Sequence, residues 1–237
     1  MSSFAVITGA TEGIGKAIAL KYLENNYSIA ICARNKSKLD ELEKLWASQF
    51  PSSKIICFVA DLSVKEEVLL FAECINRQFP KVDVIVNNAG SFKPGMFPDS
   101  ESDSDVLLES LMNTNLYSAY HLTNKLLPNM RLKQSGHIFN ICSSASLQPY
   151  APGRAYSITK YALLGFSENL REELKSDKIK VTAVSPGPVY TKSWEGSGVE
   201  PSRIMQAEDV ANMIFMASQL SPQANIDHIT MTPLQSL

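Results

Sequence analysis

Tyr156 and Lys160 lie four residues apart, a spacing that could support proton transfer. On a helix the two residues would share one face, so the ammonium group could lie close to the phenol. A free tyrosine has a pKa of about 10, which is too high for easy proton exchange at neutral pH, and a neighbouring cation lowers that pKa. Tyr156 could therefore serve as a general acid or base. A solvated helix face often produces the same spacing, so the pair alone does not establish catalysis.

A hydroxyl group precedes this pair. Residues 140–144 form the end of an apolar run that predicts a strand, and α/β sheets bind ligands outside the carboxyl ends of their strands. Ser143 could donate a hydrogen bond to a carbonyl oxygen there. Alternatively, Ser143 and Ser144 merely begin a loop, and the pattern does not decide between the two interpretations.

A glycine-rich stretch near the N-terminus could bind a phosphate-containing cofactor. Residues 8–16 read TGATEGIGK, between an apolar run and a helical pattern. Gly9 would permit a tight turn, Gly13 would let the backbone approach a diphosphate, and Gly15 would let the helix pack closely on the sheet. The helix N-terminus would offer N–H groups to an anion. A glycine-rich turn without a ligand is the alternative, but the order strand, loop, helix favours a dinucleotide.

The end of the second predicted strand bears on the choice of cofactor. An NAD site usually has a carboxylate there, whereas an arginine nearby accommodates a 2′-phosphate. The sequence has Arg34 and Asn35 at this point and no carboxylate. We therefore expect NADP(H) to be preferred, with NAD(H) not excluded. An ordinary surface arginine is the alternative for Arg34, and Glu12 argues against NADP(H) because it adds negative charge in the same region.

The elements that position these residues follow from the alternation of short apolar runs with longer helical patterns. Strands are predicted at 4–8, 28–33, 54–60, 82–87, 137–143, 180–184 and 228–231, and helices at 16–25, 36–49, 64–79, 154–175 and 207–219. A further long helix follows a loop at 91–104 and runs to about Leu126, with Pro128 close to its end. Continuous apolar strands that alternate with helices predict a parallel sheet covered on both faces. We expect an α/β fold with a doubly wound parallel sheet, the Rossmann fold, in a single domain over residues 1–237.

The composition excludes several classes of protein. Apolar residues make up 45% and charged residues 19%, which is enough for a packed core. The net charge of −2 gives no electrostatic basis for nucleic-acid binding. No apolar run is long enough to span a membrane, and Phe4–Ile7 leads directly into the glycine-rich stretch rather than forming a signal peptide. We therefore expect a cytoplasmic protein. The four cysteines and three histidines lack metal-ligand spacing, so no metal site is expected.

The order of these motifs resembles that of the short-chain dehydrogenase/reductase family, in its short single-domain form. The match runs from Val6 to about Thr191. It includes the glycine-rich stretch, the NNAG sequence at 87–90, the NTN sequence at 113–115, the interval between Ser143 and Tyr156, and the PG pair at 186–187.

The resemblance implies a role for each matched residue. Tyr156 would be the general acid in reduction, with Lys160 on the nicotinamide ribose. Ser143 would orient the substrate carbonyl, and Asn115 would bend its helix and hold a water in a proton relay with Lys160. The implied cofactor-binding residues are Gly9, Thr11, Gly13, Ile14, Gly15, Arg34, Asn35, Asp61, Leu62, Asn88, Ala89, Gly90, Tyr156, Lys160, Pro186, Gly187, Val189 and Thr191.

Two further stretches could line a substrate pocket, namely residues 147–154 and a loop at about 190–206. They offer Tyr150, Tyr190 and Trp194, which present flat apolar surfaces with polar tips. Gly196, Ser197 and Gly198 would suit a mobile lid, although a plain surface loop is the alternative. We expect compact, flat or vicinal carbonyl compounds to be preferred over long acyl chains.

The sequence therefore predicts an NADP(H)-dependent oxidoreductase that acts on a small-molecule ketone or aldehyde. Its motifs suggest a bacterial carbonyl reductase of the sepiapterin-reductase-like kind, and a 3-oxoacyl-carrier-protein-type reductase is the alternative. A non-catalytic nicotinamide-sensing protein would normally lack part of the catalytic set. An epimerase or dehydratase of the extended relatives would have another glycine spacing and a larger substrate domain. By resemblance, a homodimer or homotetramer would form through the helices that contain Asn115 and Tyr156.

Overall fold

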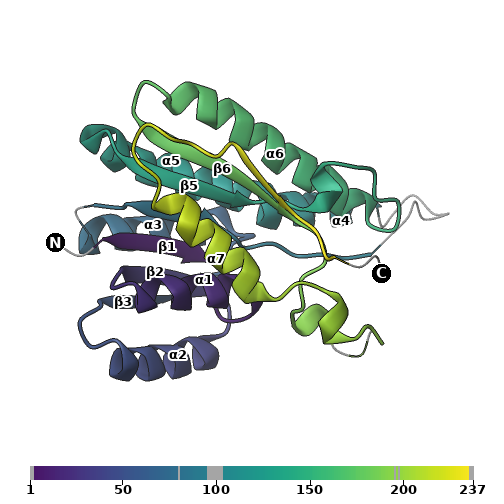
Figure 1. Ribbon diagram of the computed structural model, residues 1–237, viewed down its shortest axis with the longest axis horizontal. Helices are drawn as coiled ribbons and strands as arrows, with labels where there is room; N and C mark the ends of the chain where they lie inside the picture. The colour runs from purple at the N-terminus through teal and green to yellow at the C-terminus, as the bar shows by residue number, and fades with distance from the viewer. Residues whose placement is uncertain (1–2, 80, 95–103, 195, 197, 235–237) are drawn as a thin grey trace.

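A computed structural model describes residues 3–79, 81–94, 104–194, 196 and 198–234 of the chain. Its centre is a seven-stranded sheet with the order β3-β2-β1-β4-β5-β6-β7, in which all paired strands run parallel (Figure 1). The strands are β1 (Phe4–Thr8), β2 (Ser28–Ala33), β3 (Ile55–Val59), β4 (Val84–Asn87), β5 (Gly136–Ile141), β6 (Ile179–Pro186) and β7 (His228–Met231). The predicted doubly wound parallel sheet is thus confirmed.

Helices cover both faces of the sheet, and each layer of helices closes its own core. On one face lie α1 (Gly13–Glu24), α2 (Lys36–Gln49) and α7 (Ala207–Ser218). On the other lie α3 (Lys65–Gln78), α5 (Ser118–Lys133) and α6 (Arg154–Leu174), with α4 (Ser104–Met112) preceding α5. None of the helices in the described ranges combines the length and the apolar character that a membrane crossing requires.

The continuous apolar sequence of β1 explains why this strand lies at the centre. All five of its residues are buried. Side chains alternate between the two faces of a strand, so Phe4 and Val6 enter the core under α3 and α5, whereas Ala5 and Ile7 enter the core under α1 and α7. A strand with only one apolar face could not pack against the helices on both faces of the sheet.

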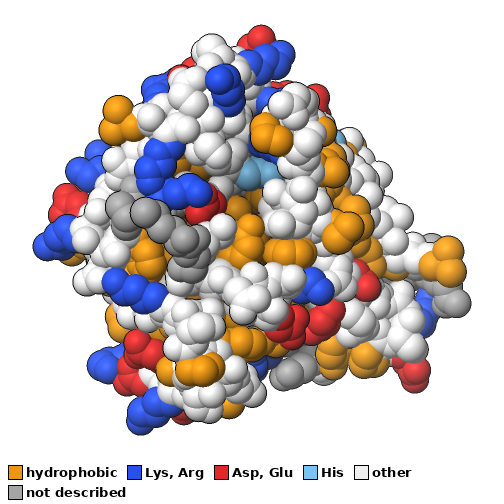
Figure 2. Space-filling view, turned by 60° about the vertical axis from the view of Figure 1, so that its left-hand side comes forward, with side chains coloured by type: hydrophobic (Ala, Val, Ile, Leu, Met, Phe, Trp, Pro, Cys, Tyr) orange, Lys and Arg blue, Asp and Glu red, His pale blue; other side chains and the backbone are white. Residues whose placement is uncertain are grey.

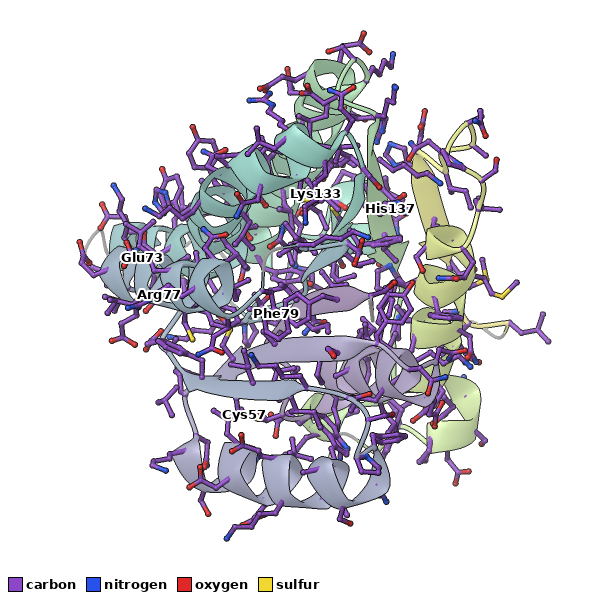
Figure 3. All side chains as sticks on the ribbon, turned by 90° about the vertical axis from the view of Figure 1, so that its left-hand side faces the viewer. Cys57, Glu73, Arg77, Phe79, Lys133 and His137 are labelled. Atoms are coloured by element: carbon purple, nitrogen blue, oxygen red, sulfur yellow. The ribbon has the colours of Figure 1, made fainter. Side chains whose placement is uncertain are left out.

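The amino ends of the strands form one side of the molecule, away from the turns that carry the predicted site. Phe79, the residue that follows α3, stacks on Phe4 with ring centroids 3.4 Å apart and closes the core there. Figure 3 labels Phe79 and His137 at this end. In Figure 2, basic and acidic side chains are mixed with apolar ones over the face turned toward the viewer.

The long helix that follows the 91–104 loop differs from its prediction in two ways. It continues to Lys133 with Pro128 inside it, because Leu127 and Met130 remain on its buried face. The carbonyl of Asn124, which loses its helical donor to Pro128, belongs to an exposed residue and can be hydrated. A π-helical turn at Asn113–Tyr117 also interrupts the helix.

The predicted strand end at Ser143 is wrong, because β5 ends at Ile141. Ser143 instead caps a short 3-10 turn, Ser144–Ser146, whose amide N–H groups need an acceptor. The first helix likewise begins at Gly13 rather than at Lys16. These differences concern only the ends of elements, where local hydrogen bonds decide the boundary.

The strand order reverses at β1. Strands β2 and β3 lie on one side of β1, and β4 to β7 lie on the other side. In a doubly wound sheet this reversal opens a crevice at the carboxyl ends of the strands. The turns after β1, β4, β5 and β6 therefore meet at one edge of the sheet, toward the right-hand side of Figure 1.

Candidate active site

The glycine-rich turn after β1 has a conformation that only glycine fits at its key positions. Gly9 and Gly13 have φ values of +65° and +55°, in the left-handed region that other residues rarely adopt. A Cβ on Gly15 would lie 2.4 Å from both the Asn88 amide nitrogen and the Gly9 carbonyl oxygen. The turn is therefore packed against the chain that follows β4, with no room for a side chain.

Asn88 holds this turn in place. Its side-chain amide donates to the carbonyls of Thr8 at 2.8 Å and Gly9 at 3.1 Å. The Thr8 hydroxyl accepts from the backbone N–H groups of Asn88 at 3.0 Å and Ala89 at 2.9 Å. The residues expected to contact a ribose thus also connect the ends of β1 and β4.

The N-terminus of α1 lies at the crevice, and the side chain of its N-cap residue does not cap it. Glu12 occupies the N-cap position and its carboxylate makes no capping hydrogen bond. The first amide groups of a helix lack partners inside it, so those that follow Glu12 are suited to bind an anion. Thr11 and Ile14 are half-buried beside them. Thr191 closes the other side, since a Cβ on Gly13 would lie 3.1 Å from the Thr191 methyl group.

The turn after β6 is fixed by the C-terminal strand and the segment near Met205. The Gly187 N–H donates to the Met231 carbonyl at 2.8 Å. Val189 pairs with Met205, and the Tyr190 N–H donates to the Met205 carbonyl at 2.7 Å. Pro186 to Thr191 thereby reach the same edge as the glycine-rich turn.

The ends of β2 and β3 carry charged side chains. Arg34 is exposed, and the Asn35 side chain caps α2 by accepting from the Lys38 N–H at 3.0 Å. Partial burial alone would raise the pKa of Asp61. Two hydrogen bonds from Ser63 and the positive charge of Arg34 outweigh burial and hold that pKa below its ordinary value. Asp61 is therefore ionised next to Arg34, with buried Leu62 beside it.

The charge of Glu12 is paired, which the sequence does not reveal. Its carboxylate lies 2.7 Å from the Lys38 ammonium. The hydrogen bond from Lys38 is the largest influence on the pKa of Glu12, and with the charges of Lys38 and Lys192 it lowers that pKa despite partial burial. Lys38 is a site residue that the sequence analysis missed. The two residues are far apart along the chain, and only the fold brings them together.

Tyr156 and Lys160 lie on one face of α6, as their spacing predicts. The Lys160 ammonium is 5.7 Å from the centroid of the Tyr156 ring. Lys160 is only 4% exposed, and within the described part of the chain its one hydrogen-bond acceptor is the Ile141 carbonyl, at 2.7 Å. An ammonium has three donors, so two remain for a ligand. A buried cation without a carboxylate partner is costly, which points to a ligand rich in hydroxyl or anionic groups.

Asn115 lies in the π-helical turn and is 1% exposed. Its side-chain amide donates to the Thr159 hydroxyl at 2.9 Å and to the Ser91 carbonyl at 3.1 Å, and its oxygen accepts from the Ser91 N–H at 2.8 Å. The Asn115 oxygen and the Lys160 ammonium both lie 3.3 Å from the position of a Cβ on Gly90. The structure thus brings Gly90, Asn115 and Lys160 together.

Ser143 begins the turn after β5, and its predicted contact with a substrate carbonyl stays a prediction. Its hydroxyl accepts from the Ala145 N–H at 3.2 Å, and the Ser146 hydroxyl donates to the Ser143 carbonyl. The turn is tied to α6 because the Ser157 hydroxyl donates to the Ala145 carbonyl at 2.7 Å. Accepting one hydrogen bond leaves the Ser143 hydroxyl proton available to a substrate oxygen.

Of the predicted substrate residues, Tyr150 is connected to Tyr156 by the ring of Phe92, which lies close to both. The Phe92 ring is 6.2 Å from that of Tyr150 and 5.2 Å from that of Tyr156. Phe92 was not predicted. Tyr190 and Trp194 are half-buried in the turn after β6. Ser197, part of the predicted lid, lies outside the described residues, and the lid stays a prediction.

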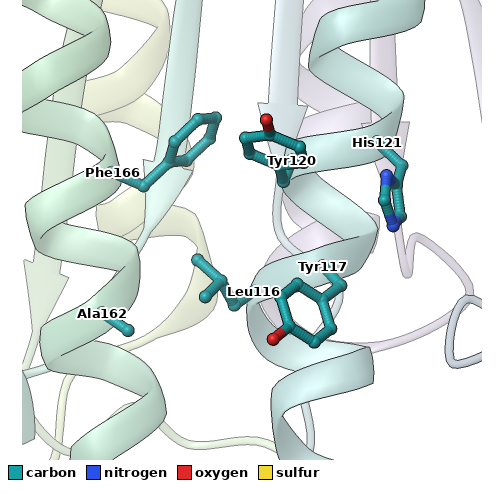
Figure 4. Close-up of a pocket in the computed structure, with 6 residues that line it drawn as sticks. All are labelled: Leu116, Tyr117, Tyr120, His121, Ala162 and Phe166. Atoms are coloured by element: carbon teal, nitrogen blue, oxygen red, sulfur yellow. The ribbon is translucent and has the colours of Figure 1, made fainter.

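Two hollows lie beside α6 rather than at the cofactor edge. One, of about 430 Å³, lies between α5 and α6 (Figure 4) and is lined by Leu116, Tyr117, Tyr120, His121, Ala162 and Phe166. The other, of about 890 Å³, is lined by Pro149, Tyr150, Ala151, Arg154, Ser157, Ile158 and Tyr161. Four residues of this second hollow, Pro149, Tyr150, Ala151 and Arg154, belong to the predicted 147–154 stretch, and Tyr150 is the one that was predicted as a site residue.

Comparisons with known proteins agree with this geometry. A family model described as short chain dehydrogenase matches residues 3–200. An uncharacterised oxidoreductase of Staphylococcus epidermidis is 29% identical over 231 residues, 97% of this chain and 96% of that protein. L-sorbose reductase from Gluconobacter frateurii, complexed with NADPH and L-sorbose, has a TM-score of 0.87 at 25% identity, covering 100% of this chain and 98% of its own. The closed form of serine dehydrogenase complexed with NADP+ has a TM-score of 0.83 at 28% identity, covering 99% and 96%. Because the family model covers most of the sequence, the chain belongs to the short-chain dehydrogenase/reductase family and is an NAD(P)-dependent oxidoreductase.

Proposed function

We propose that the chain reduces the carbonyl group of a small ketone or aldehyde to an alcohol with NADPH, and that Tyr156 donates the proton. The observation that carries this proposal is the buried Lys160 ammonium, 5.7 Å from the Tyr156 ring centroid. A cation in this position stabilises the phenolate that remains after Tyr156 gives up its proton. The fixed geometry of α6 maintains the pair without a large conformational change.

The residues present fit a nicotinamide dinucleotide. The backbone amides at the start of α1, which the Glu12 side chain does not cap, and the tightly packed Gly15 would hold the diphosphate. The two remaining donors of Lys160 would bind ribose hydroxyls, which would also offset the cost of its burial. When bound, the cofactor supplies the hydride.

The chain's own residues would handle the substrate and the proton. Ser143 would donate a hydrogen bond to the substrate carbonyl and so orient it toward Tyr156. Asn115, whose oxygen lies close to Lys160 around Gly90, would hold a water that returns a proton toward Lys160 and Tyr156. Acid–base catalysis of this kind typically contributes about 10²–10⁴-fold in rate.

A preference for NADP(H) over NAD(H) is supported by the charges at the end of β2. Arg34 is exposed there, and a guanidinium can form a forked contact with a phosphate. The objection from Glu12 weakens because Lys38 neutralises its carboxylate at 2.7 Å. The related structures described with NADPH or NADP+ are consistent with the same preference.

Compact, flat or vicinal carbonyl compounds are the proposed substrates, with long acyl thioesters as the alternative. Aromatic residues around Tyr156 favour the first class. The test is the loss of NADPH absorbance with a panel of diketones, hydroxyketones, pterins and acyl thioesters. Faster reduction of the thioesters than of the small ketones would reject the proposed substrate class. Tight binding of NADPH with no turnover of any compound would favour a nicotinamide-sensing protein instead.

A homodimer through α5 and α6 is also proposed. Tyr117 and Tyr120 are each 45% exposed beside the hollow of Figure 4, and an exposed apolar surface of this kind often marks an interface. A second copy could cover it by symmetry. Sedimentation analysis should give a dimer or tetramer for the chain and a smaller species for Tyr120→Glu. A monomeric unmodified chain would reject this assembly.

A further inference from the structure

Phe92 is the first residue beyond Ser91, whose backbone is clamped on both sides by the catalytic-site asparagine. Asn115 accepts from the Ser91 N–H at 2.8 Å and donates to the Ser91 carbonyl at 3.1 Å. The start of the loop after β4 is thereby fixed to the π-helical turn. Phe92 is 48% exposed, and the clamp at Ser91 holds the backbone from which its ring projects.

The fixed ring of Phe92 stands against the proposed proton donor. Its centroid is 5.2 Å from that of Tyr156, with the ring planes at 90°. Tyr150, 42% exposed, also lies close to Phe92, with ring centroids 6.2 Å apart. These three rings come from the loop after β4, the segment after β5 and α6, and Phe92 contacts both of the tyrosine rings.

Gly153 makes this arrangement possible. It is buried, and a Cβ there would lie 2.7 Å from an edge carbon of Phe92 and 2.9 Å from one of Tyr150. Both rings therefore rest on the bare backbone of Gly153. Any side chain at this position would displace Phe92 and Tyr150 from their present positions.

We propose that Phe92 and Tyr150, seated on Gly153, select substrates whose carbonyl carries a flat, conjugated substituent. This inference rests on the proposed function, because it assigns part of the substrate site. A flat ring can pack against uncharged aromatic side chains by stacking or edge contact, which a puckered ring of the same size does less well. Aromatic contacts beyond simple burial correspond to about twofold to tenfold in affinity each.

The test compares two ketones of similar size, phenyl methyl ketone and cyclohexyl methyl ketone, with NADPH. The unmodified enzyme should reduce the phenyl compound with a kcat/KM about threefold to tenfold higher. Phe92→Leu keeps apolar volume but removes the ring, and Gly153→Ala keeps both rings but displaces them. Both changes should bring the ratio near one. Phe50→Leu, the same type of change at the end of α2, should leave the ratio unaltered.

A ratio near one in the unmodified enzyme, or a preference that survives Phe92→Leu, would overturn the inference and leave the proposed reductase function standing. If neither ketone is reduced, the proposed function fails for such ketones. In that case, ligand-observed NMR measures the binding of the two ketones to the NADPH-loaded chain, and the ratio of their affinities takes the place of the kcat/KM ratio. Equal binding of both ketones, or a preference unchanged by Phe92→Leu, would overturn the inference on its own.

Discussion

The carboxylate of Glu12 and the ammonium of Lys38 lie 2.7 Å apart and join the starts of α1 and α2. Both helices begin at the carboxyl edge of the sheet, where the cofactor is expected. Lys38 lies in the first turn of α2, close in sequence to Arg34. The pair therefore removes one positive charge from the neighbourhood in which a 2′-phosphate would bind.

Glu12→Gln should release this charge and strengthen the preference for NADPH. The Lys38 ammonium could then turn toward a phosphate, and charge-assisted contacts of this type are among the stronger hydrogen bonds. We expect the KM for NADPH to fall about threefold to tenfold while the KM for NADH changes little, with a smaller effect at high salt because the site is exposed. Steady-state kinetics with both cofactors measures the change.

The control is the exposed pair Lys36–Asp40 on the same helix, also 2.7 Å apart. Asp40→Asn removes the same charge as Glu12→Gln but lies away from the start of α1. Equal effects of Asp40→Asn and Glu12→Gln on the KM for NADPH would mean that only the overall charge matters, and the specific role of Glu12 would be rejected.

Arg34 should decide between the two cofactors. Arg34→Ala should raise the KM for NADPH about tenfold and barely affect NADH, because a guanidinium contacts the 2′-phosphate that only NADPH carries. The double change Ala33→Asp with Arg34→Ala should turn the preference toward NADH, since a carboxylate accepts from a ribose hydroxyl and repels phosphate. Equal use of both cofactors by the unmodified enzyme would contradict the assignment.

Tyr156→Phe should abolish most of the turnover without disturbing the fold. The substitution removes only the hydroxyl that would supply the proton, so kcat should fall by at least about 10²-fold while NADPH binding stays nearly unchanged. Tyr161→Phe is the matched control, because Tyr161 is an exposed tyrosine on the same helix. Single-turnover kinetics and fluorescence titration with NADPH separate the two effects. A Tyr156→Phe enzyme that keeps most of its rate would rule out the mechanism.

The sheet and the glycine-rich turn could be predicted from sequence because their signals are local. All five residues of β1 are buried, because a central strand is covered on both faces. Such a strand has a nearly continuous apolar sequence, which can be recognised without the structure. β1, β2 and β7 have their predicted bounds. Tyr156 and Lys160 were predicted to share a face because helical spacing alone decides that.

Features that depend on distant contacts could not be predicted. A bend of the helix at Asn115 was implied by the family resemblance, but the hydrogen bonds of Asn115 to Ser91 and Thr159, which are remote in sequence, were not predicted. The approach of Phe92 to Tyr156 likewise requires the loop after β4 to fold over α6. Sequence motifs do not specify such contacts. The sepiapterin-reductase-like subtype, the substrate and the cytoplasmic location stay predictions.

His137 should make the stability of the fold depend on pH. This residue of β5 is 4% exposed, and burial, aided by the charge of Lys180, lowers its pKa to about 3. One ring nitrogen, Nε2, lies 2.8 Å from the Thr182 hydroxyl. That hydroxyl donates to the Ile226 carbonyl, so Nε2 is the donor in its contact with Thr182. Protonation would add a charge at the buried Nδ1, which has no hydrogen-bond partner among the described residues.

In the unfolded chain a histidine takes up its proton near pH 6.5, whereas folded His137 does so only near its lowered pKa. Between these values the unfolded state binds more protons, so stability should decrease as the pH falls from about 6.5 and should be fully present above it. Thermal unfolding followed by circular dichroism should show a shallower loss of Tm in this interval for His137→Gln than for the unmodified chain. His228→Gln, at an exposed histidine, should retain the steeper loss. Parallel Tm curves for the unmodified chain and His137→Gln would show that burial of His137 does not contribute to acid sensitivity.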